Sequence, residues 1–251
     1  RIESAKNFYS DQGQETEREL VENQVAASLG LSLELVKQLS AALENEGPEK
    51  DATIPTWRKW FFRWLSKNPE LIEHVFRSET LAELFGKKKY EAFDNAQQKA
   101  AMALPVLRKL VWLWMRGEPL KELELALGTA PKNLKTCIGA RRFVLRVIPE
   151  LSFMFGLPAL LHERSQAGEE RPAPLPAAMS QLGRCVKNGF NFHEKAALSV
   201  HLRPARLTRR EIHQHFSALK PYLDPSSADE TWEQTLDRVE RAMALEINAR
   251  S

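Results

Sequence analysis

The chain has 251 residues, of which 43% are hydrophobic and 27% are charged, and its formal net charge is +3. This composition excludes a wholly disordered protein, and the length corresponds to one large domain or two domains of ordinary size. Charged or amide side chains interrupt every apolar run before it reaches about eighteen residues, so we expect no membrane-spanning helix. The net charge is too small to indicate a partner.

The two cysteines, Cys137 and Cys185, are too few for a disulfide framework or for a zinc site with four cysteine ligands. Such sparse use of cysteine is typical of a reducing compartment, and we therefore expect a cytoplasmic protein. The sequence begins at Arg1 with neither a methionine nor a signal peptide, which we interpret as an excerpt of a longer protein.

Apolar residues recur at spacings of three and four almost throughout, which predicts an all-α protein of many helices. Pro105 should kink or divide the longest helix and Pro149 should interrupt a later one, because proline removes a backbone donor and clashes with the preceding turn. The segment Leu110–Met115 is apolar on every side and is expected in the core. The predicted helices cover residues 15–29, 33–46, 57–67, 69–76, 78–85, 90–116, 120–127, 131–148 with an apolar extension to 161, 177–187, 193–201, 208–220 and 228–247.

Linker-like stretches divide the predicted helices into groups. Residues 45–55 combine glycine, proline and charges, and residues 168–176 contain three prolines without helical apolar spacing. We therefore predict an acidic N-terminal helical pair over residues 1–50 and a central helical domain over 51–167. A proline-rich linker over 168–176 would then lead to a smaller, basic C-terminal helical subdomain over 177–251.

Catalytic and cofactor-binding motifs are missing from the sequence. It has no phosphate-binding glycine loop, no HExxH or CxxC metal motif and no GxSxG nucleophile motif. Four of the six histidines lie close in sequence, at His193, His201, His213 and His215. The last two are two positions apart on a predicted helix, so they point in widely different directions and do not easily share an ion. We expect no catalytic residue, no metal site and no cofactor in this chain.

Three tryptophans, Trp57, Trp60 and Trp64, fall on one face of the predicted helix over residues 57–67. Such a face most commonly packs in the core. It can also dock another part of the protein or a partner subunit, or lie on a membrane surface, where neighbouring basic residues suit anionic headgroups. These three tryptophans are the candidate partner-binding residues.

Two stretches are more basic than the rest of the chain. Residues 131–146 hold five basic side chains and no acid, and residues 184–220 hold eight against two acids. Clustered cations raise the affinity for phosphates by releasing condensed counterions, although they also occur on solvated helix faces. Lys135, Arg142 and Arg146 would share a stripe of one predicted helix, with Arg141 beside it. The predicted nucleic-acid-binding residues are Lys132, Lys135, Arg141, Arg142 and Arg146.

The segment Leu110–Leu151 resembles the helical region that follows the motor domains of Ski-type superfamily 2 helicases. The shared features are a tryptophan-containing helix that ends at Gly117, a short helix, a turn at Gly128 and a longer helix with paired arginines. The resemblance implies ATP-hydrolysing motor domains upstream and an accessory region with a helix-loop-helix or ratchet-like centre beside a single strand. Arg141 and Arg142 match the family's paired basic positions. A bacterial repair or defence setting follows only by analogy.

Three functions remain open at this point. The leading one is the nucleic-acid-binding C-terminal region of an ATP-dependent helicase, which holds a single strand while motor domains step. A second is a protein-interaction scaffold that recruits a partner subunit through the acidic helices and the tryptophan face. The third treats residues 120–148 as a helix-turn-helix that reads duplex DNA with Lys132, Asn133 and Lys135. Exposure of the three tryptophans would favour the scaffold.

Overall fold

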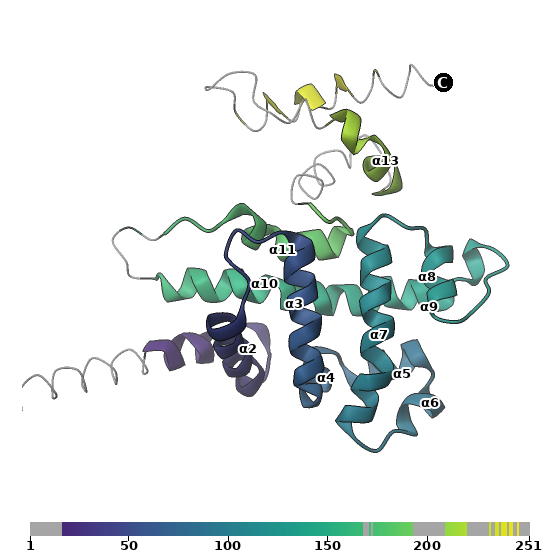
Figure 1. Ribbon diagram of the computed structural model, residues 1–251, viewed down its shortest axis with the longest axis horizontal. Coiled ribbons are helices and arrows are strands. Elements are labelled where there is room, and N and C mark those ends of the chain that lie inside the picture. The colour runs from purple at the N-terminus through teal and green to yellow at the C-terminus, as the bar shows by residue number, and fades with distance from the viewer. Residues whose placement is uncertain are drawn as a thin grey trace, which may run out of the picture. The chain divides into compact units, whose positions relative to one another are not determined.

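The computed structural model describes residues 17–167, 171, 173–192, 209–219, 231, 234–235, 237–239, 241–242 and 245. All regular elements in this part of the chain are helices, which confirms the predicted all-α class (Figure 1). The first helix covers residues 17–29. It is followed by α2 (Leu33–Glu46), α3 (Ile54–Lys67), η1 (Pro69–Leu71), α4 (Ile72–Val75), α5 (Ser78–Phe85), α6 (Lys87–Glu91), α7 (Ala96–Met115), α8 (Leu120–Ala126), η2 (Leu134–Thr136), α9 (Ile138–Arg142), η3 (Phe143–Val147), α10 (Ile148–Ser165), α11 (Ala177–Asn188) and α13 (Arg209–Leu219).

The chain forms two compact units, and each is assembled from two segments. Unit 1 comprises residues 1–104 and 153–180, and unit 2 comprises residues 105–152 and 181–251. The chain passes from one unit to the other within α7, α10 and α11. Linker composition can mark only contiguous domains, so the predicted ranges 1–50, 51–167 and 177–251 do not coincide with these units. The predicted helix over residues 193–201, and most of that over 228–247, lie outside the described residues.

Side-chain caps and an aromatic contact organise unit 1. The hydroxyls of Ser32 and Thr53 each accept the backbone N–H three residues further on, at the start of α2 and of α3. Each helix therefore begins where a side chain satisfies a backbone donor that has no partner within the helix. Phe61 of α3 packs against Phe155 of α10, with ring centroids 4.8 Å apart.

The core of unit 2 contains aliphatic and aromatic side chains, and α7, α8, η3, the start of α10 and the end of α11 contribute to it. The Ser152 hydroxyl donates a hydrogen bond of 2.8 Å to the carbonyl of Gly183 and so connects α10 with α11. The indole N–H of Trp114 donates to the carbonyl of Val186 at 2.8 Å, which connects α7 with α11. The largest fully buried side chains of this unit include Phe143, Phe190, Leu107 and Leu110.

Two prolines do not end their helices: Pro105 was expected to kink or divide one helix, and Pro149 to interrupt another. The helix α7 continues through Pro105 and is not divided there. Pro149 is the second residue of α10 and directly follows the π-helical η3. The wider π-helical turn relieves the clash that a proline ring makes with a regular α-helical turn.

The elements α9, η3 and α10 form one helical run, Ile138–Ser165. By length and composition alone this run is long and apolar enough to cross a membrane, although no uninterrupted run of eighteen apolar residues occurs in the sequence. Only two charged residues, Arg146 and Glu150, interrupt residues 143–161. The mean hydropathy of eighteen residues within the run therefore stays high, at 1.6. Of the apolar window, 44% is buried inside the protein, and the core helix of a soluble protein meets the same criterion.

Candidate nucleic-acid interface

A buried carboxylate joins α8 to the start of α9. Glu124 is only 4% exposed. Its carboxylate oxygens accept the backbone N–H of Ala140 at 2.6 Å and that of Gly139 at 3.4 Å. The Thr129 hydroxyl donates to the same carboxylate at 2.8 Å. A negative charge at the N-terminus of a helix satisfies free N–H groups and interacts favourably with the helix dipole, so Glu124 anchors the first turn of the run that begins at Ile138.

Gly139 leaves little room for a side chain at this junction. A Cβ atom at Gly139 would lie 2.7 Å from the Leu127 side chain and 3.3 Å from the Glu124 carboxylate. Gly117 and Gly128, which end the neighbouring helices, have φ of +82° and +84°. They form the turns expected from the sequence, because glycine adopts this left-handed conformation without a steric penalty.

The predicted helix over residues 131–148 is wrong at its start, because residues 134–136 form a separate 3₁₀ turn, η2. The Asn133 side chain accepts the N–H groups of Lys135 and Thr136 at 2.9 and 3.2 Å, and the Thr136 hydroxyl accepts the N–H of Asn133 at 3.3 Å. This reciprocal capping closes the turn on itself. Lys132 and Lys135 therefore lie in the connection before α9. The predicted stripe of Lys135 with Arg142 and Arg146 on one helix does not exist.

The three predicted arginines lie on the exposed side of the helical run. Arg141, Arg142 and Arg146 are exposed, as are Lys132 and Lys135 of the preceding connection. On the opposite side of the same helix, Ala140, Phe143 and Val147 are buried. The structure therefore presents all five predicted cations to solvent, on two consecutive segments of unit 2.

Apolar side chains lie among these cations. Ile138 and Leu145 are 57% and 71% exposed, and Leu134 of η2 is exposed as well. Among the residues that the structure describes, Lys132, Lys135, Arg141 and Arg146 form no ion pair. Unneutralised cations beside exposed aliphatic groups can bind a ligand that offers both negative charge and apolar surface.

The tryptophan face of α3 belongs mainly to the core. Trp57 and Trp64 are 2% and 5% exposed. Trp60 is partly exposed and stacks on Trp64, with centroids 6.2 Å apart and an interplanar angle of 10°. The side chains that would have to contact a partner already pack within unit 1. This observation argues against the three tryptophans as a docking surface.

Part of the C-terminal basic stretch also has an internal role. The guanidinium carbon of Arg209 lies 3.6 Å from the centroid of the Trp114 ring, and Nη2 donates to the Glu118 carbonyl at 2.6 Å. Burial lowers the pKa of Arg209 to about 10, so it remains a cation at neutral pH. His213, four residues later, hydrogen bonds to the Gly189 carbonyl at 2.9 Å. These contacts hold α13 in unit 2.

No group of three metal-ligating side chains occurs within the described residues. His213 and His215 are both described, whereas His193 and His201 lie outside the described residues, as do Lys195, Arg203, Arg206 and Lys220 of the basic stretch.

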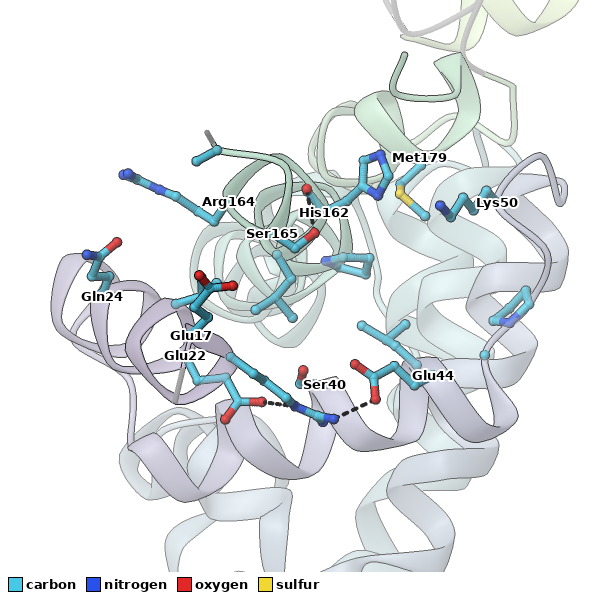
Figure 2. A pocket seen from close by; sticks show the side chains of 18 of the residues that line it. Glu17, Glu22, Gln24, Ser40, Glu44, Lys50, His162, Arg164, Ser165 and Met179 are labelled. Atoms are coloured by element: carbon cyan, nitrogen blue, oxygen red, sulfur yellow. Dashed lines mark hydrogen bonds and ion pairs between the residues drawn. The ribbon is translucent and has the colours of Figure 1, made fainter. Parts of the chain in front are cut away.

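Unit 1 contains a cavity of about 880 Å³ between the helix over residues 17–29, α2 and the end of α10. Arg18 donates to Glu22 at 3.0 Å and to Glu44 at 2.6 Å, and the dashed lines that end at Glu22 and Glu44 in Figure 2 mark these two contacts. The other charged groups of the lining are carboxylates together with Lys50 and Arg164. Because positive and negative groups are interspersed and partly paired, the cavity does not indicate one class of ligand.

Sequence reasoning missed a second exposed basic stripe, on α7. Arg108, Lys109, Trp112 and Arg116 are exposed, although the segment Leu110–Met115 was expected in the core on every side. Leu110, Val111 and Met115 are indeed buried. The spacing of four between Arg108, Trp112 and Arg116, with Lys109 three residues before Trp112, could have revealed the stripe, but the surrounding apolar residues obscured it.

Comparisons with protein-family models, curated proteins and solved structures give no match to this chain.

Proposed function

We propose that this chain binds a single-stranded nucleic acid through a basic surface formed by Lys132, Lys135, Arg141, Arg142 and Arg146. The observation that carries the proposal is the lack of ion pairs on four of these cations, Lys132, Lys135, Arg141 and Arg146, within the described residues. Cations that no carboxylate neutralises release counterions when phosphates replace them, which is the main driving force for binding nucleic acid without sequence preference.

Contact with the backbone of a strand is favoured over reading of duplex DNA by a helix-turn-helix. Lys132, Asn133 and Lys135 would have to lie on the recognition helix, but they precede it, and the Asn133 carboxamide oxygen is occupied by the capping of η2. The exposed side chains of Ile138 and Leu145 add apolar contacts that suit unpaired bases rather than a phosphate groove.

The test is the salt dependence of binding to a labelled thymidine oligonucleotide that forms no secondary structure. If about five phosphates are engaged, the logarithm of the association constant should fall with the logarithm of salt concentration with a slope of roughly −3.5. Replacing Arg141 and Arg146 together with glutamine should weaken binding at about 50 mM salt by roughly tenfold and reduce the slope by about 1.4.

A matched control is available in α3, where Lys59 and Arg63 are also exposed. The double substitution Lys59→Gln and Arg63→Gln removes the same charge from unit 1. It should change the affinity by no more than about twofold, because salt screens charges that do not contact the strand. Equal losses in both double variants, or no binding of the unaltered protein at low salt, would contradict the proposal. Preferential binding to equimolar phosphatidylserine and phosphatidylcholine vesicles would indicate a membrane surface instead.

The resemblance to Ski-type helicases would assign this surface to a protein that also carries ATP-hydrolysing motor domains. This part of the proposal rests on the resemblance alone. Its test is ATP hydrolysis by a longer protein that contains this chain: an oligonucleotide should stimulate the hydrolysis, and the substitutions Arg141→Gln and Arg146→Gln should reduce the stimulation.

A further inference from the structure

The second half of α7 has an exposed face on which cations flank a tryptophan. Arg108, Lys109, Trp112 and Arg116 are exposed and follow one another at helical spacings of one to four residues. The opposite face is fully buried at Leu107, Leu110, Val111 and Met115. All of these residues belong to unit 2, so the face lies in the same unit as the basic surface around Arg141.

Trp112 is 39% exposed, which is unusual for a side chain of this size inside an apolar segment. The guanidinium carbon of Arg116 lies 4.5 Å from the centroid of its ring, and Arg116 also has a loose ion pair with Glu118, at 3.8 Å between Nε and a carboxylate oxygen. This cation–π contact helps to hold the indole in place at the surface.

The net charge of this face is positive, and two of its three cations have no carboxylate partner among the described residues. The helix α7 contains no acidic residue, and Arg108 and Lys109 form no ion pair within the described part of the chain. Basic side chains beside an exposed aromatic ring are the combination that binds unpaired nucleotides, because the cations contact phosphates while the ring stacks on a base. A duplex would keep its bases away from the indole, so the exposed ring favours an unpaired strand over a duplex.

We infer that the exposed face of α7 is a second contact surface for single-stranded nucleic acid, on which an unpaired base stacks on Trp112 while Arg108 and Lys109 bind phosphates. The inference rests on the proposed function, since it concerns the same ligand, but it depends on different residues. It makes the unpaired base, and not the phosphate backbone alone, part of what the protein recognises.

The experiment compares three ligands, namely the labelled thymidine oligonucleotide, the same strand annealed to its complement, and inorganic polyphosphate. Trp112→Ala should weaken binding of the single strand about tenfold without changing the salt slope, because stacking involves no counterion release. The conservative variant Trp112→Phe should retain most of the affinity. Neither substitution should change the affinity for polyphosphate, which has no bases.

Substitution of both cations tests the other half of the inference. Arg108→Gln together with Lys109→Gln should reduce the salt slope by about 1.4 and weaken binding of all three ligands. Phe153→Ala is the matched aromatic control, because Phe153 is 41% exposed in unit 1 and should not affect binding. Far-UV circular dichroism and thermal unfolding establish that each variant is folded. Photocrosslinking of the unaltered protein to a strand containing 5-iodouridine should label Trp112.

The outcomes separate this inference from the proposed function. If Trp112→Ala binds like the unaltered protein and the crosslink maps elsewhere, while Arg141→Gln and Arg146→Gln weaken binding, the inference is overturned and the proposed function stands. If only the α7 variants weaken binding, the inference stands and the proposed surface at Arg141 does not. If the unaltered protein binds none of the three ligands, both are overturned.

Discussion

The helices over residues 17–46 and the segment over residues 131–146 use their charges in opposite ways. In the first region both described cations are paired: Arg18 with Glu22 and Glu44, and Lys37 with Glu19 at 2.6 Å. In the second region the nearby buried carboxylate, Glu124, accepts backbone N–H groups instead. A net charge of +3 therefore combines a region whose described cations are paired with a region in which Lys132, Lys135, Arg141 and Arg146 form no ion pair among the described residues.

Among the substitutions that test this difference between the two regions, Glu124→Ala should change the stability most. The substitution leaves the N–H groups of Ala140 and Gly139 without an acceptor at a buried position, so it should lower the free energy of unfolding by about 3 kcal/mol. Urea unfolding followed by circular dichroism measures the change, and Glu122→Ala on the exposed side of α8 should change it by less than about 0.5 kcal/mol. If the folded Glu124→Ala variant instead binds the strand more tightly, the negative charge of Glu124 lowers the affinity of the nearby cations for phosphates.

The next effect concerns the glycine at the same junction. Gly139→Ala places a methyl group 2.7 Å from the Leu127 side chain, and the crowding should outweigh the gain in helix propensity, with a net loss of about 1 kcal/mol. A methyl group at Gly156 of α10 would meet no atom within 4 Å, so Gly156→Ala should raise stability by about 0.5 to 1 kcal/mol. The opposite signs can be read from thermal unfolding midpoints. Equal gains in both variants would show that the α8–α9 junction can relax.

A smaller effect is expected in the paired region. Arg18→Met removes both ion pairs of Arg18 and leaves Glu22, which is buried, without its cation, so a loss of about 1 kcal/mol is expected. Lys37→Met breaks a single solvent-exposed pair and should therefore destabilise the protein less than Arg18→Met does, as urea unfolding of both variants can measure. Neither variant should alter strand binding beyond the weak effect of distant charge. If either one lowers the affinity as much as Arg141→Gln with Arg146→Gln does, the distinction between the two regions fails.

Helical spacing alone predicted most of the helices, because each buries one apolar face and begins or ends at a residue with a clear local preference. Ser32 as the cap of α2 and Gly117 at the end of α7 are such residues. The predicted exposure of Arg141, Arg142 and Arg146 agrees with the structure because charged side chains avoid the core unless they are paired.

The remaining features depend on contacts between residues far apart in sequence. The start of α9 at Ile138 depends on Glu124, which lies fifteen residues before Gly139, and no local pattern reveals such a pairing. Arg209 belongs to the basic stretch over residues 184–220, but its guanidinium contacts Trp114 and Glu118 within unit 2. Trp112 looked like a core residue, but only the packing of α7 decides which of two neighbouring tryptophans faces solvent.

The smallest change in stability is expected at Glu73, a carboxylate that both pairs with a cation and accepts hydrogen bonds from uncharged groups. Glu73 accepts hydrogen bonds from the Lys99 ammonium at 2.8 Å, the Ser78 hydroxyl at 2.6 Å and the Tyr90 hydroxyl at 3.1 Å. The hydrogen bond from Lys99 contributes most to holding the pKa of Glu73 below its ordinary value, followed by that from Ser78. Because the folded state binds the proton less readily than the unfolded state does, this carboxylate stabilises the fold above the ordinary carboxyl pKa. That contribution disappears as the pH falls through the lowered pKa.

Glu73→Gln should therefore destabilise the protein at about pH 7 and hardly at all at a pH below the lowered pKa of Glu73, where the unaltered side chain is itself protonated. The Glu73 side chain is 35% exposed, so solvent screening limits the expected difference at neutral pH to about 0.5 kcal/mol. Urea unfolding of both proteins at each pH measures it, and Glu70→Gln, at an exposed position in η1, should show no such dependence. A difference that persists at low pH would show that Glu73 acts through its shape and hydrogen bonds rather than its charge. Glu73 would then resemble Glu124, whose role is structural, more than Glu19, whose role is to neutralise a cation.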